Sequence, residues 1–413
     1  MTRTERTYYV VWSFYCFAWS FLMPVYPLFL LSRGLDLFQI NVVLAVFLIT
    51  SFLFEVPTGA LADLAGRKTT FLLSCFMRMA AFTLYFFAHG FADFLVAEGV
   101  DAVGNTLANG ALDAWAVDSM RAEGAVQSTD RFFARAQMIA RTVMIASGLA
   151  GGYLAQRNIA LPWLVAAASF GLTGLVAAAI MREHAAPRVE AARRNGSLLR
   201  TVRNGLAAVR RTPVMLSLCL LTALLAFAVM PFQMTWQPRM QTLTGEGAWL
   251  MGWIWAVVNL AAIAGAALIP RLLDQYRREY VLTVATLTRG SMLAAAAIAT
   301  TVFPALMGVL MMEIGFGLTE PLLQSWMNEH IEPEQRATVL SVRAMSFTLG
   351  GGAGLVCIGL AARDLGIPIA WGVSAALLVL TAPGFLLLGR QARRVRPAVV
   401  RDSAAAKVLP SAG

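Results

Sequence analysis

The chain has 413 residues, of which 58% are hydrophobic and 14% are charged, and its mean hydropathy is +0.67. This composition excludes a water-soluble globular protein and indicates an integral membrane protein. The net charge of +10 could suggest a nucleic-acid partner, but the basic residues gather in alternate loops rather than on one soluble face, which argues against nucleic acid.

Apolar segments near or above the ~20 residues that cross ~30 Å of hydrocarbon recur along most of the chain. The sequence therefore predicts an all-α membrane protein with twelve transmembrane helices. In chain order the predicted helices are 8–31, 38–62, 70–89, 92–118, 132–155, 160–181, 213–237, 247–270, 280–301, 304–329, 338–362 and 367–389. An even number of spans places both termini on the same side of the membrane.

Arginine and lysine are distributed unevenly between the two sets of loops. One set contains Arg67, Lys68, Arg121, Arg131, Arg271, Arg277, Arg278, Arg390, Arg393, Arg394 and Arg396. The loops of the other set contain the single arginines Arg33, Arg157, Arg239 and Arg363. Basic loops remain on the cytoplasmic side of a membrane. Both termini are therefore predicted to be cytoplasmic, and a bacterial inner membrane is the expected location.

The second half of the chain repeats charged and kinking residues of the first half at a constant offset of 211 positions. The matching pairs are Pro27 and Pro238, Asp63 and Asp274, Arg67 and Arg278, Arg78 and Arg289, Trp115 and Trp326, and Asp118 and Glu329. The repeat predicts two pseudo-symmetric six-helix bundles, at 1–181 and 213–389. A cytoplasmic linker with an amphipathic helix joins them at 182–212, and a disordered cytoplasmic tail follows at 390–413. Parallel repeats leave a midplane cleft that can open to each side in turn, as in a transporter.

The turn between the second and third predicted helices has a distinctive composition. Residues 59–68 read G-A-L-A-D-L-A-G-R-K. Gly66 gives the tight turn its backbone freedom, and Gly59 lets a neighbouring helix approach closely. Asp63 and Arg67 can each meet an opposite charge or a helix terminus, so the turn can act as a latch that holds one conformation.

This turn resembles the signature loop of the major facilitator superfamily, G-x-L-a-D-r-x-G-r-k, from which only Leu64 departs. The resemblance covers essentially the whole chain and implies the twelve-helix fold of that family. In the family, the aspartate and the first arginine of the loop form a charge cluster with an acid of helix four. The resemblance assigns this role to Asp63, Arg67 and Asp118, with a second copy in Asp274, Arg278 and Glu329.

Residues 24–27, P-V-Y-P, are similar to an element of the twelve-helix drug:proton antiporters in that superfamily. This likeness implies proton-coupled efflux of small amphipathic or hydrophobic, drug-like compounds by alternating access. Two positions depart from the antiporter pattern. Leu95 stands where helix four usually has an arginine, and residues 148–152, G-L-A-G-G, lack the proline of helix five. A proton-coupled uptake symporter for an organic solute is the alternative, because one fold can run in either direction.

Five ionisable residues lie deep inside predicted helices, where each charge costs at least ~2.5 to 3.5 kcal/mol and therefore usually lines a cavity or pairs with another charge. We expect the acids to bind the coupling proton and the arginines to act as counter-charges. The acids are Glu55, Asp113 and Glu320, and the arginines are Arg78 and Arg289. The alternative is that these groups form fixed ion pairs between helices.

Polar residues follow one face of helix four and one face of helix ten at spacings of three and four, which predicts a hydrated path. The first stripe is Glu98, Asp101, Asn105, Asn109 and Asp113, and the second includes Glu313, Glu320 and Gln324. Aromatic and amide residues of helices one and seven offer large, tolerant surfaces for a substrate. They are Tyr15, Trp19, Tyr26, Phe232, Gln233 and Trp236. The alternative for the aromatic residues is a position that faces lipid.

Sequence patterns of enzymes are not found: the chain has no H-E-x-x-H zinc pattern, no G-x-S-x-G elbow and no G-x-x-x-x-G-K-[ST] phosphate loop. We therefore expect no catalytic residue, no metal site and no cofactor. A non-transporting receptor or scaffold is a distant alternative, because buried charges would have no use there. The expected partners are a small-molecule substrate, protons and the lipid bilayer, and the chain is expected to be a monomer.

Overall fold

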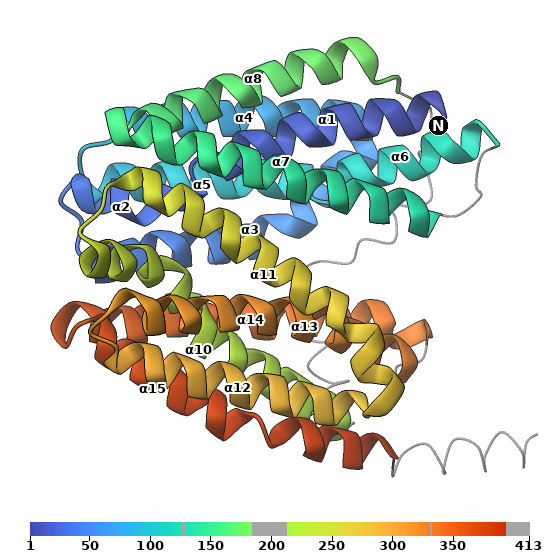
Figure 1. Cartoon of the computed structure of the whole chain (residues 1–413). Coiled ribbons are helices and arrows are strands. Elements are labelled where there is room, and N and C mark those ends of the chain that lie inside the picture. The colour runs from blue at the N-terminus through green and yellow to red at the C-terminus, as the bar shows by residue number, and fades with distance from the viewer. Residues whose placement is uncertain (125–128, 184–212, 331–332, 394–413) are drawn as a thin grey trace, which may run out of the picture.

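The computed structural model describes residues 1–124, 129–183, 213–330 and 333–393, and within these ranges every regular element is a helix. The amphipathic helix predicted in the linker and the tail beyond residue 393 lie outside the described residues. The chain forms two helical bundles that lie side by side, the first drawn in blue to green and the second in yellow to red (Figure 1).

The first bundle contains the helices of the first half of the chain. They are α1 (Arg3–Ser20), the 3-10 helix η1 (Met23–Val25), α2 (Tyr26–Ser32), α3 (Leu37–Ala65), α4 (Arg67–Phe87), α5 (Phe91–Ala108), α6 (Ala111–Ala122), α7 (Thr129–Arg157) and α8 (Leu161–Ile180). Two predicted spans are broken inside the bundle. Pro24 and Pro27 fall at the break between α1 and α2, where they cannot donate backbone hydrogen bonds. Gly110, at φ +74°, separates α5 from α6.

The second bundle contains longer helices with fewer breaks. They are α10 (Pro213–Thr244), α11 (Ala248–Gln275), α12 (Arg278–Ile298), α13 (Val302–His330), α14 (Pro333–Asp364) and α15 (Ile367–Thr381). After a turn at 382–383 the chain is helical again up to Arg393, four residues beyond the predicted end of the last span.

Eleven of the described helical segments are long and apolar enough to cross a membrane. The twelfth predicted span is the broken pair α5 and α6, where Asp93, Glu98 and Asp101 fall within a single run of 18 residues. These three charges set this span apart from the other eleven segments. The predicted fold, two related six-helix bundles in a membrane, is confirmed.

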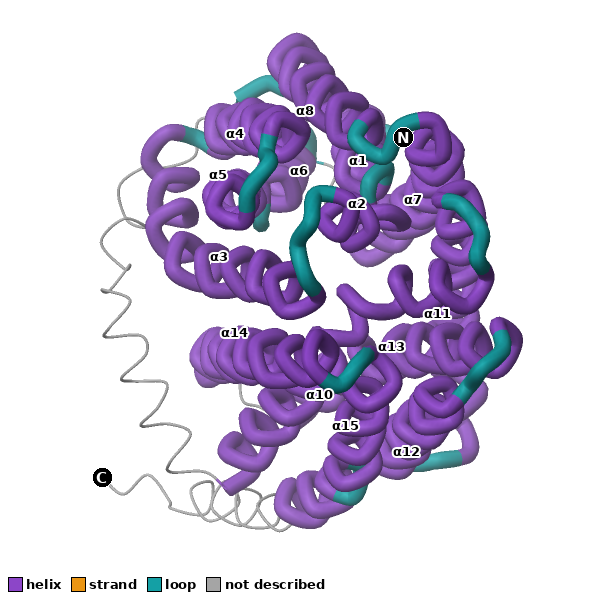
Figure 2. The backbone as a smooth tube through the Cα atoms, turned by 90° about the vertical axis from the view of Figure 1, so that its left-hand side faces the viewer, coloured by secondary structure: helices purple, strands orange, loops and turns teal. Residues whose placement is uncertain are grey.

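The two bundles meet along two pairs of helices, α3 with α14 and α7 with α11 (Figure 2). These two interfaces are related by the repeat. A Cβ atom added to Gly359 would lie 2.8 Å from the Cβ of Asn41, and one added to Gly252 would lie 3.0 Å from the backbone oxygen of Gly148. The repeat carries Asn41 onto Gly252 and Gly148 onto Gly359. The contact of Asn41 with Gly359 therefore corresponds, position by position, to the contact of Gly252 with Gly148.

The halves are in contact at one end of the molecule and separate at the other. We call the end with the N-terminus and Gly66 the basic end, and the end with Gly34 and Gly245 the distal end. At the distal end, Gln237 donates to the backbone oxygen of Met23 (3.4 Å) across the interface. At the basic end, a Cβ atom added to Gly59 would have nothing within 4 Å. The expectation of a close helix contact at Gly59 is therefore wrong for this conformation, because the halves are apart there.

Candidate transport chamber

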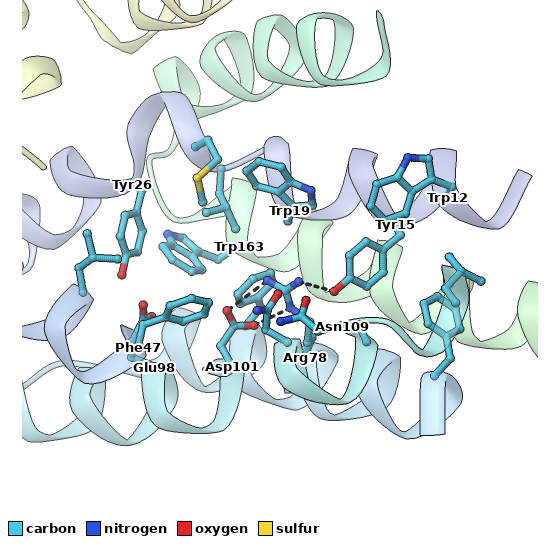
Figure 3. Close-up of a pocket in the computed structure, with 18 of the residues that line it drawn as sticks. Trp12, Tyr15, Trp19, Tyr26, Phe47, Arg78, Glu98, Asp101, Asn109 and Trp163 are labelled. Carbon is cyan, nitrogen blue, oxygen red and sulfur yellow. Dashed lines mark hydrogen bonds and ion pairs between the residues drawn. The ribbon is translucent and has the colours of Figure 1, made fainter. Parts of the chain in front are cut away.

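A cavity of ≈ 470 Å³ lies within the first bundle, and we call it the first-half chamber (Figure 3). It brings together nine of the residues singled out from the sequence, namely Tyr15, Trp19, Tyr26, Arg78, Glu98, Asp101, Asn105, Asn109 and Asp113. The whole polar stripe of the fourth span lines this one cavity, although the helix breaks at Gly110. The break is therefore compatible with one continuous polar face.

Arg78 lines the chamber, and all three nitrogen atoms of its guanidinium donate hydrogen bonds to neighbouring side chains. Its Nε and Nη2 atoms donate to the two carboxylate oxygens of Asp101 at 2.7 and 3.1 Å, and its Nη1 donates to the hydroxyl of Tyr15 at 2.7 Å. The guanidinium also lies 4.6 Å from the ring centre of Phe170. Gly104 permits this packing, because a Cβ there would lie 2.7 Å from the Cγ of Arg78. A bidentate pair with only 6% and 5% of the two residues exposed is a fixed structural element.

Glu98 lies one turn of α5 further toward the distal end and is also buried, with 4% of its surface exposed. It accepts a short hydrogen bond from the hydroxyl of Tyr85, which lies 3.0 Å from the hydroxyl of Tyr26. Within the described part of the chain, no lysine or arginine lies at ion-pair distance from Glu98, since Arg78 pairs with Asp101. Glu98 is thus a buried carboxyl group held by phenols alone.

The polar stripe becomes more exposed toward the basic end. Asn105 is half-buried, whereas Asn109 and Asp113 are exposed, and Asp113 accepts a hydrogen bond of 2.6 Å from the hydroxyl of Tyr8. Asn109 and Gly110 also line a second cavity of ≈ 340 Å³ at the basic end. The chamber therefore connects toward this end through the α5–α6 break.

This basic-end cavity contains three residues of the predicted latch and one predicted proton site. Gly59, Asp63 and Arg67 line it, together with Glu55, which is exposed. Neither Asp63 nor Glu55 forms an ion pair with any described residue. Glu55 is exposed because the separation of the halves opens its side of α3, and its role in binding the coupling proton stays a prediction.

Ion pairs form at equivalent positions of the two repeats. The Nε atom of Arg67 lies 3.1 Å from a carboxylate oxygen of Asp118, and Arg278 pairs with Glu329. The second pair forms although the glycines of the first turn are replaced by Pro270 and Arg277. Asp274, like Asp63, pairs with none of the described residues, so each copy consists of one arginine and one acid.

Gly66 is required both by its backbone conformation and by the lack of space for a side chain. Its φ is +95°, and a Cβ atom there would lie 2.8 Å from a carboxylate oxygen of Glu183. Glu183 accepts from the backbone N–H groups of Arg67 and Lys68, each at 3.0 Å, and so caps the start of α4. The sequence offered no signal for Glu183, because its partners are backbone atoms 115 and 116 residues away.

A third cavity, of ≈ 470 Å³, lies between the two bundles, and we call it the interface cavity. Its walls include Gln233, Trp236 and Glu313, as predicted, and also Trp12 and Trp19, which line the first-half chamber as well. These two tryptophans therefore separate two compartments of equal volume.

Arg141 of α7 also lines the interface cavity, and its Nη1 donates to Asn259 of α11 at 3.1 Å, so this bond joins the two bundles. Sequence analysis missed Arg141, although a charge in the middle of the predicted span 132–155 is the signal that would have found it.

Three predicted residues of the second half lie elsewhere than expected. Phe232 is packed in the core against Trp371, with ring centres 5.5 Å apart, and lines neither large cavity. Gln324 is half-buried and also lines neither of them. Glu320 pairs with Arg343 of α14 at 2.8 Å rather than with Arg289. The polar stripe of α13 is thus divided, because Arg343 draws Glu320 away from the interface cavity.

A family model described as the Major Facilitator Superfamily matches residues 9–355. The chain belongs to this superfamily. Over 148 residues it is 28% identical to YxaM of Bacillus subtilis (strain 168), described as an uncharacterized MFS-type transporter. This match spans about a third of each protein, 36% of the chain and 36% of the relative.

Solved structures of several transporters have the same fold. The nucleoside transporter NupG has a TM-score of 0.76 at 13% identity, with 94% of this chain and 99% of that chain covered. A bacterial homolog of the human lysosomal transporter Spinster, inward-facing and unoccupied, has a TM-score of 0.74 at 14% identity, with 95% and 97% covered. The human organic anion transporter MFSD10 has a TM-score of 0.64 at 16% identity, with 93% and 99% covered. Identities this low show a common fold alone.

Membership of the superfamily indicates a multi-pass membrane transporter. The predicted family is confirmed at this level. None of the relatives named above is described as a drug:proton antiporter.

Proposed function

We propose that this superfamily member couples proton movement to the transport of small aromatic or amphipathic organic compounds that are neutral or positively charged. The observation that carries the proposal is the first-half chamber, which combines aromatic walls with carboxyl groups in a volume of ≈ 470 Å³. Drug-sized ligands occupy cavities of about this size, with largely apolar walls and few polar anchors.

The aromatic walls support an aromatic substrate. Trp12 and Trp19 border both the chamber and the interface cavity, so a compound bound beside them has flat, rigid surfaces on which to stack. The stacked pair of Trp12 and Tyr15, with ring centres 5.8 Å apart, extends this surface toward the basic end.

The charges of the chamber support a neutral or cationic substrate. Arg78 and Asp101 neutralise each other, which leaves the carboxyl groups of Glu98 and Asp113 without a cation among the described residues. An anion entering this chamber would meet acidic groups and no free positive charge. A cation would gain from Asp113 and from the faces of the aromatic rings.

Export is the proposed direction, and the cytoplasmic side of a bacterial inner membrane is the proposed position of the basic end. The positive charges of its loops and the P-V-Y-P element support these proposals. The chain would act as a monomer by alternating access. In that cycle the turn at Gly59, Asp63, Gly66 and Arg67, with its second copy at Arg278 and Glu329, would hold one conformation as a latch.

Uptake by proton symport is the second candidate. Leu95 and the proline-free residues 148–152 depart from the antiporter pattern. The proteins of similar fold also include a nucleoside transporter and a peptide transporter.

Proton flux in reconstituted vesicles tests both candidates. The purified full chain is placed in liposomes with a pH-sensitive dye inside, and ethidium, uridine or 1-naphthalenesulfonate is added outside. Transport of ethidium is expected to drive protons across the membrane in the direction opposite to ethidium. The sulfonate is expected to cause no proton movement. Proton movement together with uridine, in the same direction, would favour the symporter. No proton movement with any compound, in vesicles that do transport one of them, would contradict proton coupling.

The sequence-based proton sites require a separate test, since the structure places them in different surroundings. Asp113 faces the chamber, Glu55 faces the basic-end cavity and Glu320 is paired with Arg343. Of the three, Asp113→Asn is the variant from which we expect loss of proton-driven transport. Vesicles in which Asp113→Asn retains the full proton flux would remove this residue from the proposed mechanism.

A further inference from the structure

We propose that Glu98, held by the hydroxyls of Tyr85 and Tyr26, is the residue that carries the coupling proton through the transport cycle. The proposal rests on the proton coupling proposed above. It places the proton-carrying acid at Glu98 rather than at Glu55 or Glu320, and it keeps Asp113 as the last group on the path by which the proton leaves. The step itself is simple. Water on the distal side gives a proton to a carboxylate oxygen of Glu98, and the same proton later passes to water in the chamber.

The first argument is the absence of a counter-charge at a buried acid. The charged or titratable groups around Glu98 are Asp101 on its own helix, Arg78 and Tyr85 on α4, and Tyr26 on α2. Arg78 is the single cation among them, and its donors are already engaged, because Nε and Nη2 donate to Asp101 and Nη1 donates to Tyr15. An ionised carboxylate without a cation is costly in an apolar interior, whereas a protonated one is not. In this conformation Glu98 is therefore the carboxyl group of the chamber that most favours the proton-bearing form.

The second argument is the path toward the basic end. From Glu98 the side chains of Asp101, Asn105, Asn109 and Asp113 follow one another along the chamber wall, and their exposure increases in that direction. Asn109 is shared with the basic-end cavity. A proton that leaves Glu98 can therefore reach solvent at the basic end through groups that all accept hydrogen bonds.

The third argument is the closure on the distal side. The ring of Tyr85 stacks on Trp163 with centres 4.1 Å apart and planes 10° apart, and Phe29 lies 5.0 Å from the same tryptophan. Tyr85, Phe29 and Trp163 are all fully buried. The phenol that binds Glu98 is thus part of a buried aromatic layer between Glu98 and the distal end of the first bundle. Tyr26 and Glu98 lie together at one end of the chamber and Trp12 lies toward the other (Figure 3).

This shared residue couples proton binding to the conformation. In the proposed cycle, opening of the distal end displaces α2, because Leu28 of α2 packs with core residues of the second half. Tyr26 of α2 contacts the hydroxyl of Tyr85, so opening also disturbs the hydrogen bond to Glu98. Glu98 is then exposed to distal water when the layer opens and to the chamber when it closes. Alternating access of one acid to the two sides is the requirement for proton coupling.

Infrared spectroscopy of the purified full chain tests the proton site without any substrate. Wild-type protein near neutral pH is expected to have the carbonyl band of a protonated carboxyl group, and Glu98→Gln is expected to lose it. Asp113→Asn is the control and is expected to keep the band, because Asp113 is exposed. Tyr85→Phe removes one hydrogen bond and is expected to shift the band, which keeps the test valid if Glu98→Gln does not fold. A band that persists unchanged in both Glu98→Gln and Tyr85→Phe would overturn the proposal.

Transport in vesicles distinguishes failure of this inference from failure of the proposed function. At equal pH on both sides, Glu98→Gln is expected still to exchange labelled for unlabelled ethidium across the membrane. When a pH gradient is applied, its accumulation of ethidium is expected to be at least tenfold lower than that of the wild type, which corresponds to about 1.4 kcal/mol of coupling. If wild-type vesicles show no pH-driven accumulation, the proposed function fails. If wild-type vesicles show it and Glu98→Gln retains it, proton coupling stands and the assignment to Glu98 is wrong.

Discussion

Two equivalent arginines of the repeat, Arg78 and Arg289, have the same position and different surroundings. Each lies against a glycine of the next helix, Gly104 in the first half and Gly315 in the second. Arg78 has a bidentate carboxylate and a phenol. Arg289 has one long hydrogen bond to Thr319, at 3.5 Å, and its buried Nε atom has no partner among the described residues.

The difference follows from the residues that the repeat places around each arginine. The second-half equivalents of Tyr15, Tyr26, Tyr85, Glu98 and Asp101 are Ala226, Gln237, Ala296, Val309 and Met312. Every carboxyl or phenolic member of the chamber is therefore replaced in the second half, while the arginine and the close contact with a glycine of the next helix are kept. Duplication preserved the scaffold, and the ionisable chemistry is concentrated in one half.

The largest expected effect on this comparison comes from removing each arginine in turn. Arg78→Met leaves Asp101 as an unpaired buried charge and is expected to destabilise the protein by about 3 to 5 kcal/mol. Arg289→Met removes an arginine that has no ion pair among the described residues, and the expected change is below about 1 kcal/mol. Thermal and denaturant unfolding of the purified variants in detergent measures both. Equal destabilisation by the two variants would contradict the asymmetry.

A second prediction concerns the interface rather than the charges. Gly359→Leu forces α14 away from Asn41 at the distal end, because even a Cβ atom there would lie 2.8 Å from that side chain. The expected shift toward a form closed at the basic end is about tenfold in population, or about 1.4 kcal/mol. Spin labels at the exposed basic-end residues Leu64 and Leu340 should therefore report shorter distances.

Gly59→Leu is the matched control for this interface test, because the position has no neighbour within 4 Å in the present conformation. The Gly59→Leu variant should keep the long distance between the labels at Leu64 and Leu340, because the added side chain prevents closure of the basic end. Shorter distances in Gly59→Leu, or no change in Gly359→Leu, would be inconsistent with rocking about the distal contacts.

The smallest expected effect comes from the helix cap at Glu183. Glu183→Gln keeps the shape of the side chain but removes the negative charge that accepts two backbone N–H groups at the start of α4. The expected loss is about 0.5 to 2 kcal/mol of stability, read from the thermal midpoint. Glu246, an exposed acid at the distal end, provides the control, and Glu246→Gln should change the midpoint less. A larger loss from Glu246→Gln would exclude the cap.

The sequence predicted the elements that depend on local composition and on the repeat. Apolar runs defined the twelve spans, and the offset of 211 positions anticipated the equivalent ion pairs of Arg67 and Arg278. Both signals are properties of the chain itself, so they need no knowledge of packing.

The partners of buried charges could not be predicted in the same way. Depth along a helix suggested Asp113 and Glu320 as buried acids, yet Asp113 is exposed to the chamber and Glu320 pairs with Arg343. The sequence placed Glu98 in the polar stripe of a hydrated path, because nothing in it shows that Arg78 pairs with Asp101 and leaves Glu98 without a cation. Helix rotation and the separation of the halves decide these pairings.

The claim that the ionisable chemistry lies in the first half is tested most directly by the heat of ethidium binding in buffers of different ionisation enthalpy. The wild-type protein is expected to exchange a proton on binding, so that the heat depends on the buffer. Glu98→Gln should lose this dependence, and Glu313→Gln, a matched change on α13 of the second half, should keep it. A dependence that survives in Glu98→Gln and disappears in Glu313→Gln would contradict the account.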